Sequence, residues 1–162
     1  MAREKRIAIE VNGRRHELSV ASNQTLLDLL RTLGYADVKC GCEKADCGAC
    51  AVLMDGEAVD SCIVLAAMAD GRRVTTVTGL GTPEKPHPLQ AAFIETGATQ
   101  CGYCIPGMIV AAKALLDRHP EPTDADMRFG LSGNLCRCTG YTRIFSAIRE
   151  AAGALKAKGV RP

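Results

Sequence analysis

Apolar and other residues alternate at the start of this chain, the pattern of a strand with one buried face. Apolar side chains recur at every second position from Ile7 to Val11. The pair Asn12-Gly13 comes next and is a signal for a tight hairpin turn. A second short strand is predicted from Glu17 to Val20, so the chain is expected to open with a β-hairpin.

Leucines at helical spacing follow this hairpin. Thr25 is a candidate N-cap for the predicted helix, and Gly34 marks its end. The leucines that share one face of it are Leu26, Leu29, Leu30 and Leu33. A cysteine-rich loop is then expected from Lys39 to Cys50.

A second hairpin and one more strand complete the predicted N-terminal half. The segments Ala51 to Met54 and Ala58 to Asp60 flank Asp55-Gly56, another hairpin signal. The last predicted strand runs from Arg73 to Val77. Two hairpins, one helix and a final strand predict a β-grasp sheet of the ferredoxin kind.

A stretch rich in Gly and Pro, residues 79–88 (GLGTPEKPHP), separates this half from a helical one. We predict an N-terminal domain over 1–79, a linker over 80–88 and a C-terminal domain over 89–162. Four helices are predicted in the second half: Pro88–Thr96, Pro106–Arg118, Asp124–Leu131 and Gly140–Lys156. The expected fold class is α+β, a β-grasp domain followed by a four-helix bundle.

Eight of the nine cysteines fall into two groups of four. The first quartet has the spacing C-x4-C-x2-C-x11-C: Cys42, Cys47, Cys50 and Cys62. The second quartet has the spacing C-x2-C-x31-C-x-C: Cys101, Cys104, Cys136 and Cys138. The first spacing is that of plant-type ferredoxins, whose thiolates hold a [2Fe–2S] cluster. Two complete sets in 162 residues predict two such clusters and a protein that passes single electrons.

Zinc and disulfides are the alternative uses of these cysteines. Paired Cys motifs often form structural zinc sites, an option left open here, although the spacing of the first quartet fits ferredoxins better. The N-terminus has no apolar export signal, and Arg14-Arg15 lies inside a predicted hairpin, so we expect a cytoplasmic protein. Thiols stay reduced in the cytoplasm, and disulfides therefore explain nine cysteines poorly.

Charge and motifs narrow the possible functions further. The formal net charge is +2 with neutral cysteines, and two oxidised clusters bring it to about −2. There is no basic stripe with interleaved aromatics, so no nucleic-acid partner is expected. No apolar run is long enough to span a membrane. The sequence has no Ser/His/Asp arrangement, nucleotide fingerprint or P-loop, so no catalytic residue is expected on this chain.

The residues around the cysteines suit anionic clusters. Pro106 follows Cys104 at the start of a predicted helix, and Thr139 follows Cys138 as a candidate N-cap. Two positive helix ends are therefore predicted to point at the second cluster. Three small residues are expected to let backbone N–H groups approach the first cluster: Ala45, Gly48 and Ala49.

A few polar residues outside the quartets also allow predictions. Cys40 in place of Cys42 would give an x6 spacing before Cys47, so we predict that Cys40 is a free thiol near the first cluster. Thr123 and Asp126 resemble a capping box. The three histidines have no ligand spacing and are expected to be solvated or to cap helices.

Three runs of sequence together resemble one protein family. They are Cys42 to Cys50 (CEKADCGAC), Gln100 to Met108 (QCGYCIPGM) and Gly133 to Tyr141 (GNLCRCTGY). They resemble the small iron–sulfur subunits of molybdenum hydroxylases, the xanthine dehydrogenase and aldehyde oxidoreductase family. The resemblance implies a β-grasp domain and a four-helix bundle with one [2Fe–2S] cluster each.

The resemblance also implies partners. A large subunit would hold molybdopterin, with Gln100 and Cys138 closest to the pterin. Electrons would pass through the second cluster and then the first, to FAD on a medium subunit or to an external acceptor, in a dimer of heterotrimers. An N-heteroaromatic or purine substrate is favoured, while aldehydes, carbon monoxide and aryl-CoA thioesters stay open. A stand-alone two-cluster ferredoxin is the alternative function.

Three positions depart from the family's usual pattern. Ala45 stands where the family often has Gly, so a difference in loop conformation is expected there, and Ile105 replaces a usual Thr near the second cluster. Cys40 is unusual as well. None of the three replaces a quartet cysteine.

Overall fold

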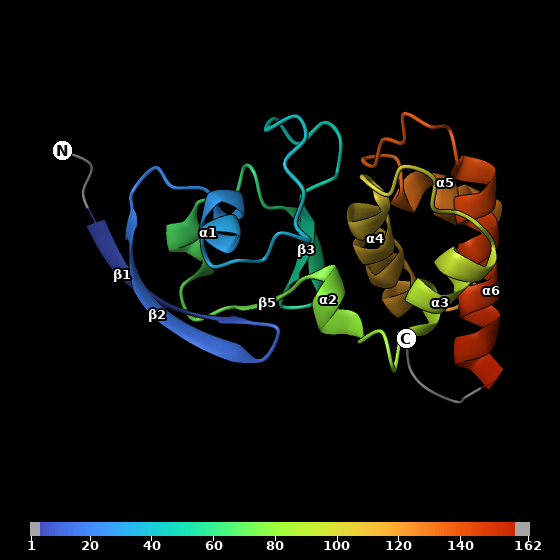
Figure 1. The fold of residues 1–162 in the computed structure, drawn as a ribbon, viewed down its shortest axis with the longest axis horizontal. Helices are drawn as coiled ribbons and strands as arrows, with labels where there is room; N and C mark the ends of the chain where they lie inside the picture. Colours follow the sequence, from blue (N-terminus) through green and yellow to red (C-terminus); the bar gives the residue numbers. More distant parts are fainter. Residues whose placement is uncertain (1–3, 158–162) are drawn as a thin grey trace.

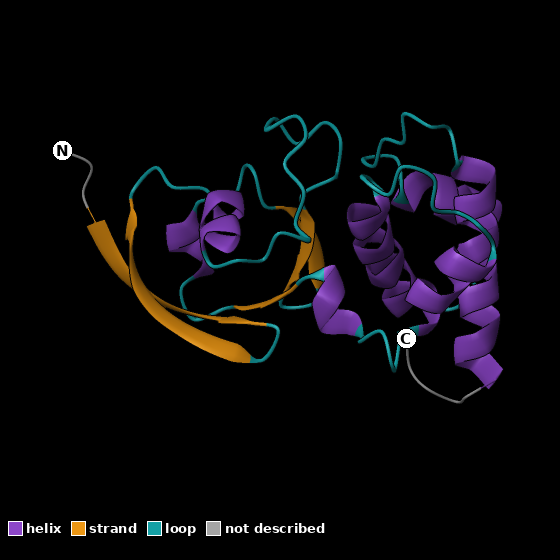
Figure 2. Cartoon of the chain, in the orientation of Figure 1, coloured by secondary structure: helices purple, strands orange, loops and turns teal. Residues whose placement is uncertain are grey.

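The structure is a computed structural model that describes residues 4–157 (Figures 1 and 2). The N-terminal half forms a five-stranded sheet in the order β2-β1-β5-β3-β4. Its strands are β1 (Glu4–Val11), β2 (Arg14–Ala21), β3 (Ala51–Met54), β4 (Glu57–Asp60) and β5 (Arg73–Thr75). Strands β1 and β5 pair in parallel, and the other neighbours pair antiparallel. The predicted α+β class and ferredoxin-like sheet are confirmed.

Both predicted hairpins form, and their turns explain why. Asn12 and Gly13 have φ of 51° and 79°, and Asp55 and Gly56 have φ of 51° and 91°. Two successive residues with positive φ make the type I′ turn that suits the twist of paired strands. Strand β2 begins at Arg14, earlier than predicted, because this two-residue turn places Arg14 directly opposite Val11.

The prediction that the last strand reaches Val77 is wrong. Strand β5 ends at Thr75, and a short helix, α2 (Val77–Leu80), begins two residues later. The neighbouring strand β1 has already ended at the hairpin turn, so it offers no further backbone for pairing. The side chain of Asn12 instead accepts the Thr76 N–H at 2.8 Å, which ends the ladder.

One hydrophobic core lies between the sheet and helix α1 (Leu26–Thr32). The helix begins as predicted, with the Thr25 hydroxyl accepting the Asp28 N–H at 3.1 Å. Its buried leucines face the inner side of the sheet, where Ile9, Val11 and Val20 are also buried. A 3-10 helix, η1 (Ala66–Ala69), which the sequence did not predict, covers part of the same core.

The four predicted helices of the second half are confirmed to within one residue at each end. They are α3 (Pro88–Glu95), α4 (Ile105–Arg118), α5 (Asp124–Gly130) and α6 (Tyr141–Ala157). The predicted Thr123–Asp126 capping box is present at α5, and His87 caps α3 by accepting the Leu89 N–H. The helices enclose a second core that includes Phe93, Met108, Leu116, Ile144 and Ile148. The domain boundaries stay a prediction.

The two halves meet where helix α4 lies beside strand β3 (Figure 1). Small side chains allow this approach, since the buried contact is made by Ala51, Leu53, Val110 and Ala114. At the first turn of α4 the contact becomes tighter, because a Cβ on Gly107 would overlap the carbonyl oxygen of Gly48. The start of α4 therefore lies against the cysteine-rich loop of the other half.

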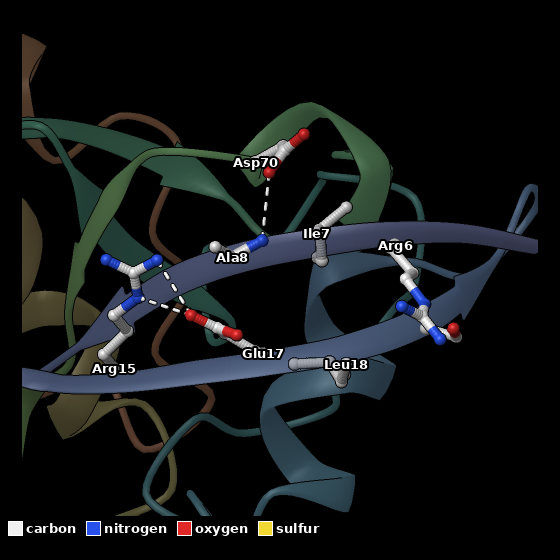
Figure 3. A pocket seen from close by; sticks show the side chains of 8 residues that line it. Arg6, Ile7, Ala8, Arg15, Glu17, Leu18 and Asp70 are labelled. Carbon is white, nitrogen blue, oxygen red and sulfur yellow. Dashed lines mark hydrogen bonds and ion pairs between the residues drawn. The ribbon is translucent and has the colours of Figure 1, made fainter.

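The outer face of the β1–β2 hairpin carries a groove of about 640 Å³ (Figure 3). Within it Arg15 pairs with Glu17 at 2.8 Å, and Asp70 accepts the Ala8 N–H at 3.0 Å. The strand order places this groove at the opposite edge of the sheet from β3, so it plays no part in the cysteine sites. Among residues 4–157, no helix is long and apolar enough to cross a membrane.

We predict that Gly107→Ala and Gly153→Ala have opposite effects on stability. Gly107→Ala is expected to destabilise by about 1–3 kcal/mol, because its Cβ must displace the Gly48 backbone. Gly153 lies exposed within α6 with nothing near its Cβ position, so Gly153→Ala is expected to stabilise by about 0.5–1 kcal/mol. Thermal unfolding of the cluster-loaded proteins measures both, and equal effects would contradict the tight contact.

Candidate metal centres

The eight cysteines of the two quartets lie as four pairs of neighbouring thiols. In each pair, the nearness of one thiol contributes to the pKa shift of the other. The pairs are Cys42 with Cys47, Cys50 with Cys62, Cys101 with Cys138, and Cys104 with Cys136. All nine cysteines are free thiols. Two pairs in each quartet fit a [2Fe–2S] cluster, in which each of two irons takes two thiolates.

The loop of the first quartet aims backbone N–H groups at sulfur, as predicted. Lys44 and Asp46 donate their backbone N–H groups to Cys42 Sγ at 3.4 and 3.3 Å. Both bonds lower the pKa of Cys42, and the bond from Lys44 has the larger effect. Donors directed at sulfur stabilise an anionic thiolate cluster in the same way.

Positive φ angles give this loop its shape. Glu43, Ala45 and Gly48 have φ of 56°, 60° and 65°. Ala45 thus adopts the left-handed backbone conformation that a glycine would adopt without steric cost. The loop therefore keeps a glycine-like conformation at position 45, although the residue there is alanine.

The inner thiols of each quartet are shielded from water. Burial raises the pKa of Cys50 to about 12, and the neighbouring Cys62 thiol contributes. Burial likewise raises the pKa of Cys104 to about 12, with help from Cys136. These thiols are protonated at neutral pH while no metal is bound, so metal binding must release protons.

One of the two predicted helix ends at the second quartet needs correction. Helix α4 starts directly after Cys104, which takes the N-cap position, with Pro106 in the first turn as predicted. Thr139, however, does not cap α6. It has φ of 59° and its hydroxyl donates to the Cys138 carbonyl, while the Ile144 N–H bonds to the Gly140 carbonyl. Because Thr139 has a left-handed backbone conformation, the N-cap position of α6 falls on Gly140.

Two residues of the GNLCRCTGY run organise the second quartet, a role that sequence reasoning missed. The Tyr141 hydroxyl accepts the Cys136 N–H at 2.8 Å and donates to the Asn134 carbonyl at 3.4 Å. The Asn134 side chain is buried and donates from Nδ2 to the Gly48 carbonyl at 3.1 Å. The only sequence signal was their place beside ligand cysteines, which does not reveal a partner 86 positions away.

The outer side of the second quartet is accessible. Cys101 and Gln100 are exposed, and Cys138 is partly exposed. The Gln100 amide nitrogen lies 3.2 Å from the position that a Cβ on Gly140 would take. The structure therefore brings Gln100 beside the loop that carries Cys138.

A cavity of about 460 Å³ connects the two quartets. Cys42 and Cys47 line it from one side, and Cys104 and Cys136 line it from the other. Figure 2 shows the corresponding loops gathered at the same edge of the molecule. The two candidate centres are therefore neighbours, although they belong to different halves of the chain.

Comparisons with known proteins match this arrangement. A family model described as "2Fe-2S iron-sulfur cluster binding domain" matches residues 9–76, and one described as "[2Fe-2S] binding domain" matches residues 76–149. The nicotinate dehydrogenase small FeS subunit of Eubacterium barkeri is 48% identical over 146 residues, covering 90% of this chain and 93% of that protein. The chain belongs to the family of small iron–sulfur subunits of molybdenum hydroxylases.

Solved structures extend the likeness to this family. Quinoline 2-oxidoreductase from Pseudomonas putida 86 has a chain with a TM-score of 0.90 and 39% identity, covering 96% of this chain and 98% of that chain. Aldehyde oxidoreductase from Desulfovibrio gigas has a TM-score of 0.90 and 43% identity, covering 95% of this chain but 17% of that chain.

Membership of the family establishes the role of the chain. It is the electron-transfer subunit of an oxidoreductase complex, it carries two [2Fe–2S] clusters, and such subunits work with a large molybdopterin-binding subunit. The predictions of family, function and clusters are confirmed. The interpretations as a zinc module or a stand-alone ferredoxin are not supported.

Replacement of Cys40 is predicted to leave both clusters in place. The Cys40 thiol lies outside the four pairs and donates to Glu43 Oε1 at 3.0 Å; this hydrogen bond, followed by burial, raises the pKa of Cys40. Cys40→Ser replaces the thiol with a hydroxyl that can donate the same bond to Glu43. Iron and acid-labile sulfide per chain should therefore equal those of the unmodified protein. Loss of half the iron would identify Cys40 as a ligand.

Proposed function

We propose that the first quartet holds one [2Fe–2S] cluster and the second quartet holds the other. The observation that carries this proposal is the grouping of the eight thiols into four pairs, two in each quartet. When bound, each cluster takes up and releases one electron at a time. The chain's own residues surround these positions with buried thiols, directed amide groups and the N-terminus of α4.

In this proposal, Gln100 and Cys138 are the residues nearest to the molybdopterin of the large subunit. Their support is accessibility, since Gln100 and Cys101 are exposed at the outer side of the second quartet. The inner pair, Cys104 and Cys136, lines the cavity toward the first quartet. With clusters bound, this order of groups would give electrons a path from an exposed entry through the second quartet to the first.

The finer composition of the complex belongs to the same proposal. A medium subunit with FAD, or an external acceptor, takes electrons from the first cluster, and the complex is a dimer of heterotrimers. It works in the cytoplasm, where nine free thiols are kept reduced and available to metals. The support for the other subunits is the family to which the chain belongs.

The proposed substrate is an N-heteroaromatic compound or a purine. Similar proteins of nearly the same length include the nicotinate dehydrogenase subunit and the quinoline 2-oxidoreductase chain. The substrate itself is bound by the large subunit, because this chain's cysteine sites leave no catalytic group for it. Its identity is therefore inferred from relatives and not from this chain's side chains.

Removal of one accessible thiol from each quartet is predicted to remove one cluster at a time. Cys42→Ala should lose the first cluster and Cys101→Ala the second, each retaining about half of the iron and one of two electron paramagnetic resonance signals after reduction. Neither residue is among the buried cysteines, so the fold should tolerate both changes. Cys40→Ala is the matched control and should keep both signals. Loss of the same signal in both variants would contradict the two ligand sets.

The substrate proposal predicts which compounds the native complex oxidises. The complex purified through this subunit should reduce an artificial acceptor with nicotinate or quinoline and contain molybdenum. Xanthine is assayed as the purine member of the proposed class, and benzaldehyde is the comparison substrate under the same conditions. Activity with benzaldehyde alone would reject the substrate class and leave the cluster assignment intact.

A further inference from the structure

Three hydrogen bonds join the loops of the two quartets directly, and one of them runs from the Tyr103 hydroxyl to the Cys40 carbonyl. The Leu135 N–H donates to the Cys47 carbonyl at 3.0 Å, and Asn134 Nδ2 donates to the Gly48 carbonyl at 3.1 Å. Cys47 belongs to the first quartet, and Leu135 precedes Cys136 of the second. One amide-to-carbonyl bond therefore connects a ligand of the first set with the residue directly before a ligand of the second.

Asn134 is well fixed in its place. It is 7% exposed, its backbone N–H bonds to the Leu131 carbonyl, and its own carbonyl accepts the Tyr141 hydroxyl. Because the backbone of Asn134 is held in this way, its side-chain amide has a fixed position relative to the Gly48 carbonyl. The hydroxyl that holds it also accepts the Cys136 N–H, so Asn134 and that ligand share one anchor.

The contact at Gly48 is close on two sides. A Cβ on Gly48 would overlap the Asn134 side chain and the Gly133 carbonyl, and a Cβ on Gly107 would overlap the Gly48 carbonyl. The loop after Cys47 is thus confined between the Asn134 loop and the first turn of α4. Contacts of this kind leave little freedom in the separation of the two loops.

We propose that Asn134 is a positioning residue that fixes the distance between the two clusters and thereby the rate at which an electron passes between them. The proposal rests on the ligand sets proposed above. With both clusters bound, the transfer would oxidise the centre at the second quartet by one electron and reduce the centre at the first by one, without forming or breaking a covalent bond. The rate of electron tunnelling falls steeply with distance. The hydrogen bond from Asn134 to Gly48, which holds the two ligand loops together and is called the clamp below, would therefore control that rate.

The test compares three variants of the cluster-loaded protein. Asn134→Ala removes the clamp, and Asn134→Asp keeps its size but replaces the donor with an oxygen that repels the Gly48 carbonyl. Asn23→Ala is the matched control, because Asn23 is exposed in a turn of the first half. Iron content and the presence of both paramagnetic signals are checked first in each variant, so that a failure of the ligand assignment is recognised separately.

The decisive readouts are the magnetic coupling between the two reduced clusters and the electron-transfer rate between them after a rapid reduction pulse. The unmodified protein and Asn23→Ala should show mutual splitting or broadening of the two signals and the same rate. Both Asn134 variants should show loss of that splitting and slower transfer, with both clusters still present.

Unchanged coupling and rate in the Asn134 variants would overturn the proposal. Loss of a cluster in both of them would also overturn it, because Asn134 would then be required for cluster assembly and not for spacing.

Discussion

The contact between the loops of the two quartets is the interaction on which the rest of this molecule depends, and it is held by the bonds from the Leu135 N–H to the Cys47 carbonyl and from Asn134 Nδ2 to the Gly48 carbonyl. Each half of the chain has a core of its own, and a small cluster of buried side chains around Ala51 and Ala114 lies between them. At this contact, cysteines of both quartets line one cavity, although the quartets belong to different halves of the chain. The two redox centres are therefore neighbours.

The second constraint is the cost of placing thiolates inside a protein. Burial raises the pKa values of Cys50 and Cys104, because it disfavours their charged forms. The chain offsets this with backbone donors at Cys42 and a helix N-terminus at Cys104. Cluster binding and protein stability are therefore linked, since iron takes the place of protons at the buried sulfur atoms.

Much of the fold was predictable because local signals decide it. The Asn12-Gly13 and Asp55-Gly56 turns, the Thr25 cap and the apolar faces of the helices act over a few residues, and all were confirmed. The end of β5 was not predictable in this way. It is set by the Asn12 side chain, which reaches Thr76 across 64 positions of sequence.

The candidate site shows the same limit. Cysteine spacing predicted both quartets and the family, but spacing does not tell which thiols become neighbours. Cys101 pairs with Cys138 although Cys104 is closer in sequence, because the second quartet closes only when the loops before α4 and α6 meet. The clamp at Asn134 and the cap at Gly140 depend on that closure and on positive backbone angles that sequence patterns do not reveal.

Mössbauer spectroscopy of the chain loaded with ⁵⁷Fe tests the central claim most directly. If the paired thiols hold the clusters as described, the oxidised protein contains four irons per chain, all with the spectrum of ferric iron in tetrahedral sulfur coordination within diamagnetic [2Fe–2S] clusters. Two irons per chain, or iron with the spectrum of a mononuclear centre, would contradict the account.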